Sequence, residues 1–388
     1  MSTIHKVSFF PVGNGDTVRI RLHNGRTILC DYNQVPGADR DDTPHANIQK
    51  LLKDELDEAK RDYMDVVAFT HADRDHIQGS TEFFHLEHAK KYQGDDRVKM
   101  SELWVPAAMV IESTDNDHQS EEFVILRQEA RYRMLKGEGI KVFSNPQALR
   151  DWLEPALEAQ GDAKHSRDHL IIDAGKIVQT FSLANDGVEF FVHSPYKEHC
   201  DGQDFIRNQA ALVFNIRFDC DGQKFDFLQC GDARWEDLED IVRISRYHGN
   251  GDRLKWDLYN LPHHCSYLSL GDTKGETETI PKPLVKELLL EGQKGSYIVS
   301  SSDPIRDDKD GREQVQPPHI QAKKAYERYH KEVDGRKFLV TMSEPNGYNP
   351  KPMNFEFTVG GVSYVKDSKT AGSAIATAFV PRAGKNAR

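Results

Sequence analysis

The sequence predicts a layered α/β protein in which sheets pack face to face and helices cover their outer faces. Short apolar runs of strand length occur in two series along the 388 residues, with helical periodicity between them. Hydrophobic residues make up 38% and charged residues 29% of the chain, which is typical of a globular protein with a sizeable core. Because a sheet must bury its apolar face, we expect the two series to form two packed layers.

The first series begins with strand-like segments over residues 5–31, where an Asn-Gly turn predicts a hairpin. Residues 47–62 place apolar side chains at helical spacing and are predicted to form an amphipathic helix. The apolar runs 65–70 and 102–108 have the length of buried strands. These segments predict strands with a helix packed beside them.

Residues 109–180 are polar and helix-prone and lack a clear strand set, so we expect a helical insertion. One domain is predicted over residues 1–366, followed by a flexible tail of small and polar residues at 367–388. The second series has helices at about 233–246 and 320–333, and strand-like runs at 187–195, 210–218, 223–232, 256–264 and 296–302.

Composition excludes several classes of protein. The five cysteines are scattered, odd in number and without a CxxC pair, which argues against a disulfide framework and favours a cytoplasmic location. The chain has no window of about 18 apolar residues and no secretory leader pattern, so no membrane contact is expected. Lys and Arg total 51 against 62 for Asp and Glu, a net charge of −11. This charge works against non-specific nucleic-acid binding, unless a local basic groove or bound metal ions reverse it.

The sharpest motif directly follows the apolar run 65–70 and reads HADRDH. Imidazole and carboxylate ligands without a thiolate suit Zn, Mn or Fe. His71 and Asp73 can converge on one ion while Asp75 and His76 face a second. The alternative is a helix start capped by Asp73 or Asp75, which explains one aspartate but neither histidine. The motif therefore predicts two neighbouring divalent metal ions.

Two further polar groups follow strand-like runs. Asp232 ends the segment Gln-Cys-Gly-Asp, where a carboxylate can bridge two metals or, alternatively, cap the next helix. His263 and His264 follow Pro262, and adjacent side chains at a strand end point in opposite directions. We therefore expect at most one of these two histidines to be a ligand, and two polar loop histidines are the alternative.

Other motifs occur in a fixed order along the chain: PVGNGDT at 11–17, LWVP at 103–106, VHSP at 192–195, AALVFNIRF after Asn208, CGDA at 230–233, PHHCS at 262–266 and PPH at 317–319. Together with HADRDH, they resemble the metallo-β-lactamase fold, and within it the hydrolase domain of ComEC-type competence proteins. The resemblance covers roughly residues 5–365. It implies an αββα four-layer sandwich with a two-metal site at one edge. Cys265 departs from the glycine that usually follows the histidine pair.

The resemblance also implies roles for particular residues. The first histidine of the PHHCS motif aligns with the single ligand histidine of related hydrolases, so His263 is preferred to His264. The implied metal ligands are His71, Asp73, Asp75, His76, Asp232 and His263.

Other positions stay open. No histidine clearly supplies the further ligand that many members of the fold carry, and the positions considered are His193, His118 and His165. Asn208 and His319 are candidates for substrate binding, with an ordinary structural role as the alternative for each.

The resemblance implies a metal-dependent phosphodiesterase or nuclease that acts on nucleic acid or a nucleotide with two divalent ions, Zn or Mn. Asp75 is expected to act as a ligand and to orient the attacking water. His264 is expected either to protonate the leaving oxygen or to hydrogen-bond a ligand carboxylate. The ligand set equally suits ester, lactone or thioester hydrolysis, or a metal-stabilised interaction module without turnover. The 109–180 segment is a candidate site for a protein partner.

Overall fold

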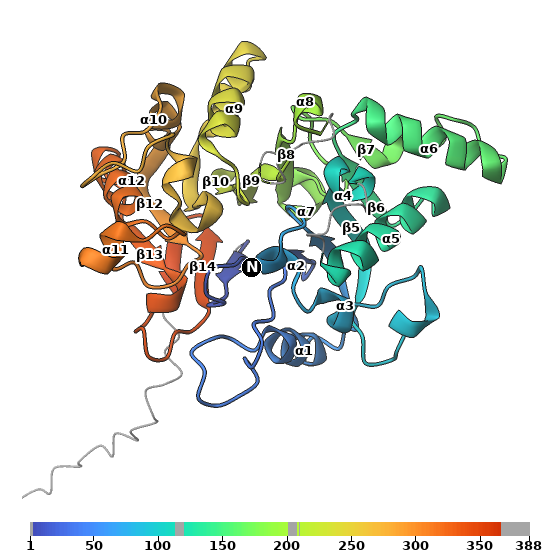
Figure 1. Cartoon of the computed structure of the whole chain (residues 1–388), viewed down its shortest axis with the longest axis horizontal. Helices are drawn as coiled ribbons and strands as arrows, with labels where there is room; N and C mark the ends of the chain where they lie inside the picture. The colour runs from blue at the N-terminus through green and yellow to red at the C-terminus, as the bar shows by residue number, and fades with distance from the viewer. Residues whose placement is uncertain (1–2, 113–119, 201–207, 209, 366–388) are drawn as a thin grey trace, which may run out of the picture.

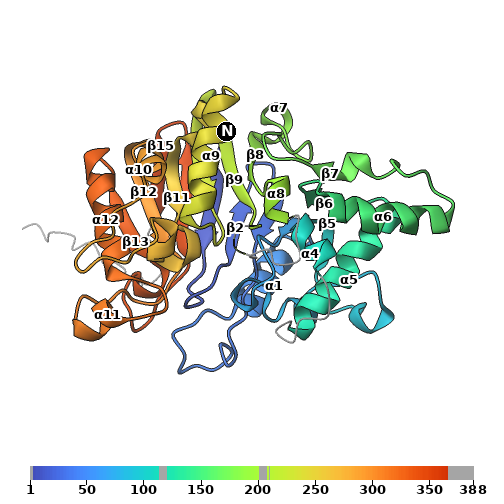
Figure 2. The ribbon, with the colours of Figure 1, turned by 45° about the horizontal axis from the view of Figure 1, so that its top comes forward.

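The computed structural model describes residues 3–112, 120–200, 208 and 210–365, and the predicted tail at 367–388 lies outside the described residues. Two sheets lie face to face between two groups of helices (Figure 1). Figure 2 shows α10 and α12 on one side of the strands and α5 and α6 on the other. The observed architecture is the predicted αββα sandwich.

The first sheet is mixed, and its described strands follow the order β15-β14-β1-β2-β3-β4-β5-β6-β7. The pairs from β3 to β7 are parallel and the others are antiparallel. The predicted hairpin is the β2–β3 pair, whose turn places Gly25 at a φ of 85°. The strands are β1 His5–Phe9, β2 Val18–Arg21, β3 Thr27–Cys30, β4 Tyr63–Ala68, β5 Lys99–Pro106, β6 Ile140–Phe143, β7 Ile171–Ile172, β14 Met353–Thr358 and β15 Gly361–Val365.

The second sheet follows the order β13-β12-β11-β10-β9-β8 among the described residues. The pairs from β10 to β13 are parallel, while β8, β9 and β10 pair antiparallel. The strand-like runs predicted from the sequence correspond to the strands from β8 to β12, and β13 was not predicted. The strands are β8 Val188–Ser194, β9 Val213–Cys220, β10 Gln223–Gln229, β11 Trp256–Asn260, β12 Gly292–Ser300 and β13 Lys337–Val340.

Three layers of buried apolar side chains hold the sandwich together. The middle layer joins inward-facing residues of both sheets, such as Trp104 of the first and Phe214 of the second. On the outer faces, the first sheet packs against helices such as α1 and α5, and the second against α9, α10 and α12. The helices are α1 Ile48–Glu58, α2 Arg74–Ile77, α3 Ser80–Phe83, α4 Ala107–Ile111, α5 Glu121–Lys136, α6 Gln147–Gln160, α7 Leu183–Asp186, α8 Lys197–Cys200, α9 Trp235–Tyr247, α10 Pro283–Leu289, α11 Lys309–Glu313 and α12 Ile320–Glu332.

The segment 109–180 contains the long helices α5 and α6, as its composition predicts. It also contributes the short strands β6 and β7, which extend the parallel part of the first sheet. Its buried residues Leu126 and Leu153 belong to the same apolar layer as β4 and β5. The segment is thus part of the main core, and its status as an insertion that binds a protein partner stays a prediction.

No helix within the described ranges combines the length and the apolar composition needed to cross a bilayer.

Helix α9 begins three residues after Asp232, and its first turn holds a buried carboxyl. Oδ2 of Asp237 accepts a hydrogen bond from the backbone N–H of Arg234 at 2.9 Å. The residue is only 1% exposed, and this burial raises the pKa of Asp237 from 3.8 to about 8. The folded state therefore holds a proton here that the unfolded chain has already released at neutral pH.

We expect the free energy of unfolding to fall as the pH rises from about 4 to about 8, because ionising Asp237 favours the unfolded state in that range. The Asp237→Asn variant stays neutral and should lose less stability between those pH values. Urea unfolding at several pH values tests this, with Asp57→Asn on the exposed face of α1 as the control. An unchanged pH profile in Asp237→Asn would contradict the assignment.

Candidate metal centre

The candidate site lies where the carboxyl ends of strands from both sheets meet. Strands β3 and β4 run parallel in the first sheet, as do β10, β11 and β12 in the second. Parallel strands bring their carboxyl ends to one edge, where loops carry functional side chains on a rigid scaffold. His76, from the loop after β4, lies 3.2 Å from Asp232, from the loop after β10.

The loop after β4 holds the HADRDH motif and the single-turn helix α2. Asp73 occupies the N-cap position of α2, but its side chain makes no capping hydrogen bond to the helix. Its Oδ2 instead lies 3.6 Å from Nε2 of His71. The helix-capping alternative therefore does not explain Asp73.

Asp232 lies at the centre of the cluster. The N-cap residue of α9 is Arg234, so Asp232 is not the cap of this helix. Oδ1 of Asp232 lies 3.2 Å from Nε2 of His76, and its Oδ2 lies 3.8 Å from Nε2 of His71. Gly231 has a φ of 48°, and a Cβ there would lie 3.0 Å from Cβ of Thr70. The absence of a side chain at Gly231 thus lets this loop approach the β4 loop closely.

The two carboxylate oxygens of Asp232 face two different groups of side chains. Its Oδ2 faces His71 and also lies 3.8 Å from Nε2 of His263. We call His71, Asp73 and His263 the His71 group. Oδ1 of Asp232 faces the other group, which consists of Asp75, His76 and His264 and which we call the His76 group. The ligand atoms of this group and of Asp232 all lie within 4.8 Å of one another.

Hydrogen bonds on the far side of the rings aim the histidine Nε2 atoms into the cluster. Nδ1 of His76 donates to Oδ2 of Asp31 at 2.8 Å, and Nδ1 of His264 donates to the carbonyl oxygen of Ser301 at 2.8 Å. Nδ1 of His71 lies 3.1 Å from Oγ1 of Thr70. Such bonds leave a lone pair on each Nε2 when the ring is neutral, as metal-ligating histidines require.

Several buried atoms at the centre lack a hydrogen-bond partner among the described residues. They are Nε2 of His71, Nε2 of His76 and Oδ1 of Asp232. They meet in ion-pair contacts around Asp232, at 3.2 Å for His76 and 3.8 Å for His71, and buried polar atoms without a hydrogen bond require an explanation. Imidazole and carboxylate donors without thiolate fit Zn or Mn, and these residues therefore fit a divalent metal centre.

Opposite charges balance this cluster in the metal-free protein. Burial alone would keep His264 neutral, but the carboxylates of Asp232 and Asp75 outweigh it and raise its pKa to about 9. Burial would likewise raise the pKa of Asp232, yet the imidazoles of His264 and His76 hold it well below its usual range. Metal binding must therefore displace protons from the histidines. The affinity for metal should decrease as the pH is lowered.

Both histidines of the PHHCS motif turn toward Asp232. The prediction that they point in opposite directions is wrong, because it assumed an extended backbone. His263 and His264 have φ values of 50° and 52°, in the left-handed region, within the short 3-10 segment Pro262–Cys265. Nε2 of His264 lies 3.6 Å from Oδ1 of Asp232, while His263 faces Oδ2. Cys265 also has a positive φ of 65°, a backbone conformation that favours glycine.

Two buried aspartates behind the cluster, Asp31 and Asp16, were not predicted from the sequence. Asp31 follows β3 and accepts hydrogen bonds from the N–H and the hydroxyl of Thr70, each at 2.7 Å, as well as from His76. Asp16 is 1% exposed and, with Asp31 and His76, forms a second set of converging potential ligand atoms. Asp31 could have been found from the sequence, because it directly follows the apolar residues of β3.

The two predicted substrate-side residues differ in position. Nδ2 of Asn208 lies 3.5 Å from Oδ2 of Asp232, so the structure brings Asn208 to the cluster. His319 is 1% exposed, and its Nδ1 accepts from the N–H of Tyr267 while its Nε2 lies 3.1 Å from the carbonyl oxygen of Val315. His319 thus supports the loop after His264, in line with the structural alternative.

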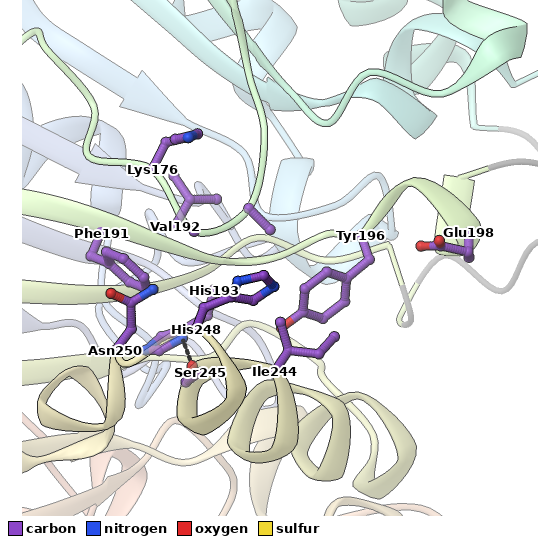
Figure 3. Close-up of a pocket in the computed structure, with 12 residues that line it drawn as sticks. Lys176, Phe191, Val192, His193, Tyr196, Glu198, Ile244, Ser245, His248 and Asn250 are labelled. Carbon is purple, nitrogen blue, oxygen red and sulfur yellow. Dashed lines mark hydrogen bonds between the residues drawn. The ribbon is translucent and has the colours of Figure 1, made fainter.

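The positions considered for a further ligand lie elsewhere or outside the described residues. His193 lines a separate cavity of about 540 Å³ between β8 and α9, where its ring contacts Ser245 (Figure 3). Its Nε2 also lies 3.0 Å from the carbonyl oxygen of Arg253. His165 is exposed and pairs with Asp168. His118 lies in a stretch that the structure does not describe. Within the described residues, none of these histidines joins the cluster.

Comparison with known proteins finds no matching family model and no matching curated protein. Among solved structures, the chain is similar to a diphosphatase of the PhnP family, with 10% identity, coverage of 92% of this chain and 99% of that chain, and a TM-score of 0.33. It is also similar to MEM-A1, a subclass B3 metallo-β-lactamase from a soil metagenome library, with 11% identity, coverage of 66% and 76%, and a TM-score of 0.31. A β-lactamase from Chitinophaga pinensis gives 12% identity, coverage of 84% and 93%, and a TM-score of 0.32. These likenesses are distant, and the resemblance to ComEC-type hydrolase domains stays a prediction.

The shared position of Asp232 predicts how metal content responds to substitution. We expect the wild type to bind two ions, His263→Ala and His264→Ala one each, and Asp232→Asn neither with comparable affinity. Loading with Mn²⁺ or Zn²⁺, desalting and elemental analysis would measure this, with the exposed His248→Ala variant as a control that keeps both ions. Full loading of Asp232→Asn would show that its carboxylate is not shared.

Proposed function

We propose that this protein is a metal-dependent hydrolase that uses two divalent ions, Zn or Mn, to cleave phosphodiesters of a nucleotide or nucleic acid. The observation that carries the proposal is the position of Asp232, whose Oδ2 faces the His71 group and whose Oδ1 faces the His76 group. A carboxylate between two such groups is suited to holding a pair of metals, which is a common arrangement for phosphoryl chemistry.

The chain's own residues divide the work between them. The His71 and His76 groups, together with Asp232, would hold the ions. When bound, the ions supply an activated water and neutralise charge on the phosphodiester. Asp75 is partly exposed, at 36% of its side chain, and can accept a hydrogen bond from the attacking water while it serves as a ligand.

His264 was predicted to protonate the leaving oxygen or to hydrogen-bond a ligand carboxylate. Its Nε2 lies 3.0 Å from Oδ2 of Asp75, and its Nδ1 is engaged by the carbonyl oxygen of Ser301. An Nε2 that ligates a metal carries no proton, so ligation and acid catalysis exclude each other at this atom. We favour the ligand role for His264, because its Nε2 belongs to the converging set around Asp232.

The negative net charge of the chain favours a small substrate over a long nucleic acid that the protein would follow along its backbone. The net charge is −11, and a protein that follows a nucleic-acid backbone needs a stripe of Lys and Arg. Metal ions would provide the local positive charge that a single nucleotide requires. All five cysteines are buried and none of them forms a disulfide, which supports our proposal of a cytoplasmic location.

Substitution in the His76 group tests the proposal. Asp75→Asn and His76→Ala should each lower Mn²⁺-dependent hydrolysis of bis(p-nitrophenyl) phosphate and of labelled single- and double-stranded DNA by about 100-fold or more, because each removes a ligand. The metal-free Asp75→Asn variant should keep a melting temperature close to that of the wild type, because this side chain is partly exposed. The metal-free His76→Ala variant should melt at a lower temperature, because it leaves the buried carboxylates of Asp31 and Asp232 without this partner. His248→Ala is the control and should keep full activity.

The same assay separates the alternatives. Hydrolysis of p-nitrophenyl acetate without hydrolysis of any phosphodiester would favour a non-phosphate ester, lactone or thioester as the substrate. Metal-dependent stabilisation without any turnover would favour the interaction module. Equal activity in the wild type and Asp75→Asn would contradict the site assignment.

A further inference from the structure

A pocket of about 450 Å³ opens directly beside Asp75. This volume is within the range of small-molecule sites in proteins. The polar residues of its wall that matter here are Asn14, Asn33, His45, Arg74 and Asp303. The pocket thus adjoins the proposed point of hydrolysis and has the size of a small-molecule site.

Gly13 leaves part of this pocket open. It has a φ of 76°, and a Cβ at this position would lie 3.3 Å from Nε2 of His45 and 3.5 Å from Oδ1 of Asp303. The imidazole and the carboxylate therefore face the same point beside the Gly13 backbone. In the described part of the chain, neither Nε2 of His45 nor the carboxylate of Asp303 has a hydrogen-bond or ion-pair partner. Both are available to a ligand.

The PVGNGDT segment holds the pocket in place relative to the metal centre. Oδ1 of Asn14 accepts from the N–H of Asp303 at 2.9 Å, and its Nδ2 donates to the carbonyl oxygen of Pro317 at 3.0 Å. A Cβ on Gly15 would lie 2.8 Å from the carbonyl oxygen of Asp75. The backbone at Gly15 therefore packs directly against Asp75. This contact fixes the position of the pocket relative to the cluster.

Arg74 supplies a cation at the boundary between pocket and cluster. It lies between Asp73 and Asp75 in sequence, is exposed, and donates from Nε to Oε1 of Gln78 at 2.8 Å. Its guanidinium makes no ion pair with a carboxylate within the described ranges. A guanidinium that is free to bind is well suited to phosphate oxygens.

We propose that this pocket binds the ribose-bearing half of a small phosphodiester and that Asp303 and His45 recognise its sugar hydroxyls. The proposal rests on the proposed function and names its substrate class. A carboxylate accepts hydrogen bonds from ribose hydroxyls, and the 2′-hydroxyl distinguishes ribose from deoxyribose. Two polar groups that face one point fit a pair of neighbouring hydroxyls, while Arg74 contacts the phosphate. The protein therefore prefers ribonucleotide diesters to DNA.

The test compares two chromogenic substrates, the p-nitrophenyl ester of adenosine 5′-monophosphate and its 2′-deoxy analogue, with the Mn²⁺-loaded full chain. We expect the wild type to favour the ribose substrate by about 10-fold or more in kcat/KM, the scale of one hydrogen bond to a charged acceptor. Asp303→Asn should reduce this preference to about 2-fold or less. Asp307→Asn, an exposed carboxylate of the same loop outside the pocket, is the matched control and should keep the preference.

Arg74→Gln provides a second comparison. Because a phosphate contact does not sense the sugar, this variant should raise KM for both substrates by a similar factor and leave the ribose preference intact. A wild type that does not discriminate the two sugars, or an Asp303→Asn variant that keeps the wild-type preference, would overturn the inference. Melting curves of Asp303→Asn check that the variant folds.

The failure of the inference can be distinguished from failure of the proposed function. If bis(p-nitrophenyl) phosphate is cleaved but ribose is not preferred, only the inference fails. If no phosphodiester is cleaved, calorimetric binding of adenosine 5′-monophosphate and its 2′-deoxy analogue to the Mn²⁺-loaded protein tests the pocket alone. About 10-fold tighter binding of the ribonucleotide, lost in Asp303→Asn, supports the pocket assignment, and equal affinities overturn it.

Discussion

The buried carboxylate of Asp31 is the interaction on which the candidate site depends. It is fully buried at the end of β3 and accepts three hydrogen bonds, two from Thr70 and one from Nδ1 of His76. Because the hydroxyl of Thr70 donates to Asp31, its oxygen is free to accept from Nδ1 of His71. One carboxylate therefore orients both histidines of the β4 loop, directly or through Thr70, and turns their Nε2 atoms toward Asp232.

The junction of the two sheets explains why a pair of metals fits at this edge. The first sheet supplies His71, Asp73, Asp75 and His76, and the second supplies Asp232, His263 and His264. Neither sheet alone offers a complete group, since Asp232 takes part in both. The cluster also balances charge without metal, because the histidines and carboxylates stabilise each other's ionised forms. The fold can therefore form before metal binds, and binding exchanges protons for ions.

The surroundings of the cluster narrow the chemistry that we propose. The chain is acidic overall, and Arg74 lines the pocket of about 450 Å³ beside Asp75 without an ion-pair partner among the described residues. A pocket with one cation and several amide and carboxylate groups suits a compact, polar ligand better than a long polyanion. The PVGNGDT segment connects the two features, because Gly13 borders the pocket and Gly15 packs against Asp75.

Local patterns in the sequence determined the layered α/β class, most strands of the second sheet and the three loops that meet at the site. These predictions succeeded because the end of an apolar run of strand length shows where the strand ends. The polar residues that directly follow can then be placed on the loop after that strand. Strands β6, β7, β13, β14 and β15 were not located. Strands β6 and β7 lie in the segment 109–180 that was predicted to be helical, and β14 pairs with β1 near the other end of the chain.

Only the tertiary structure decided which side of Asp232 each side chain faces. His263 and His264 both turn toward it because their backbone is left-handed, a conformation that spacing does not reveal. The role of Asp31 likewise depends on Thr70 and His76, which lie 39 and 45 residues away in the chain. Residue types and their positions after strands are local properties, whereas ring orientation and hydrogen-bond partners depend on which loops the folded sheets bring together.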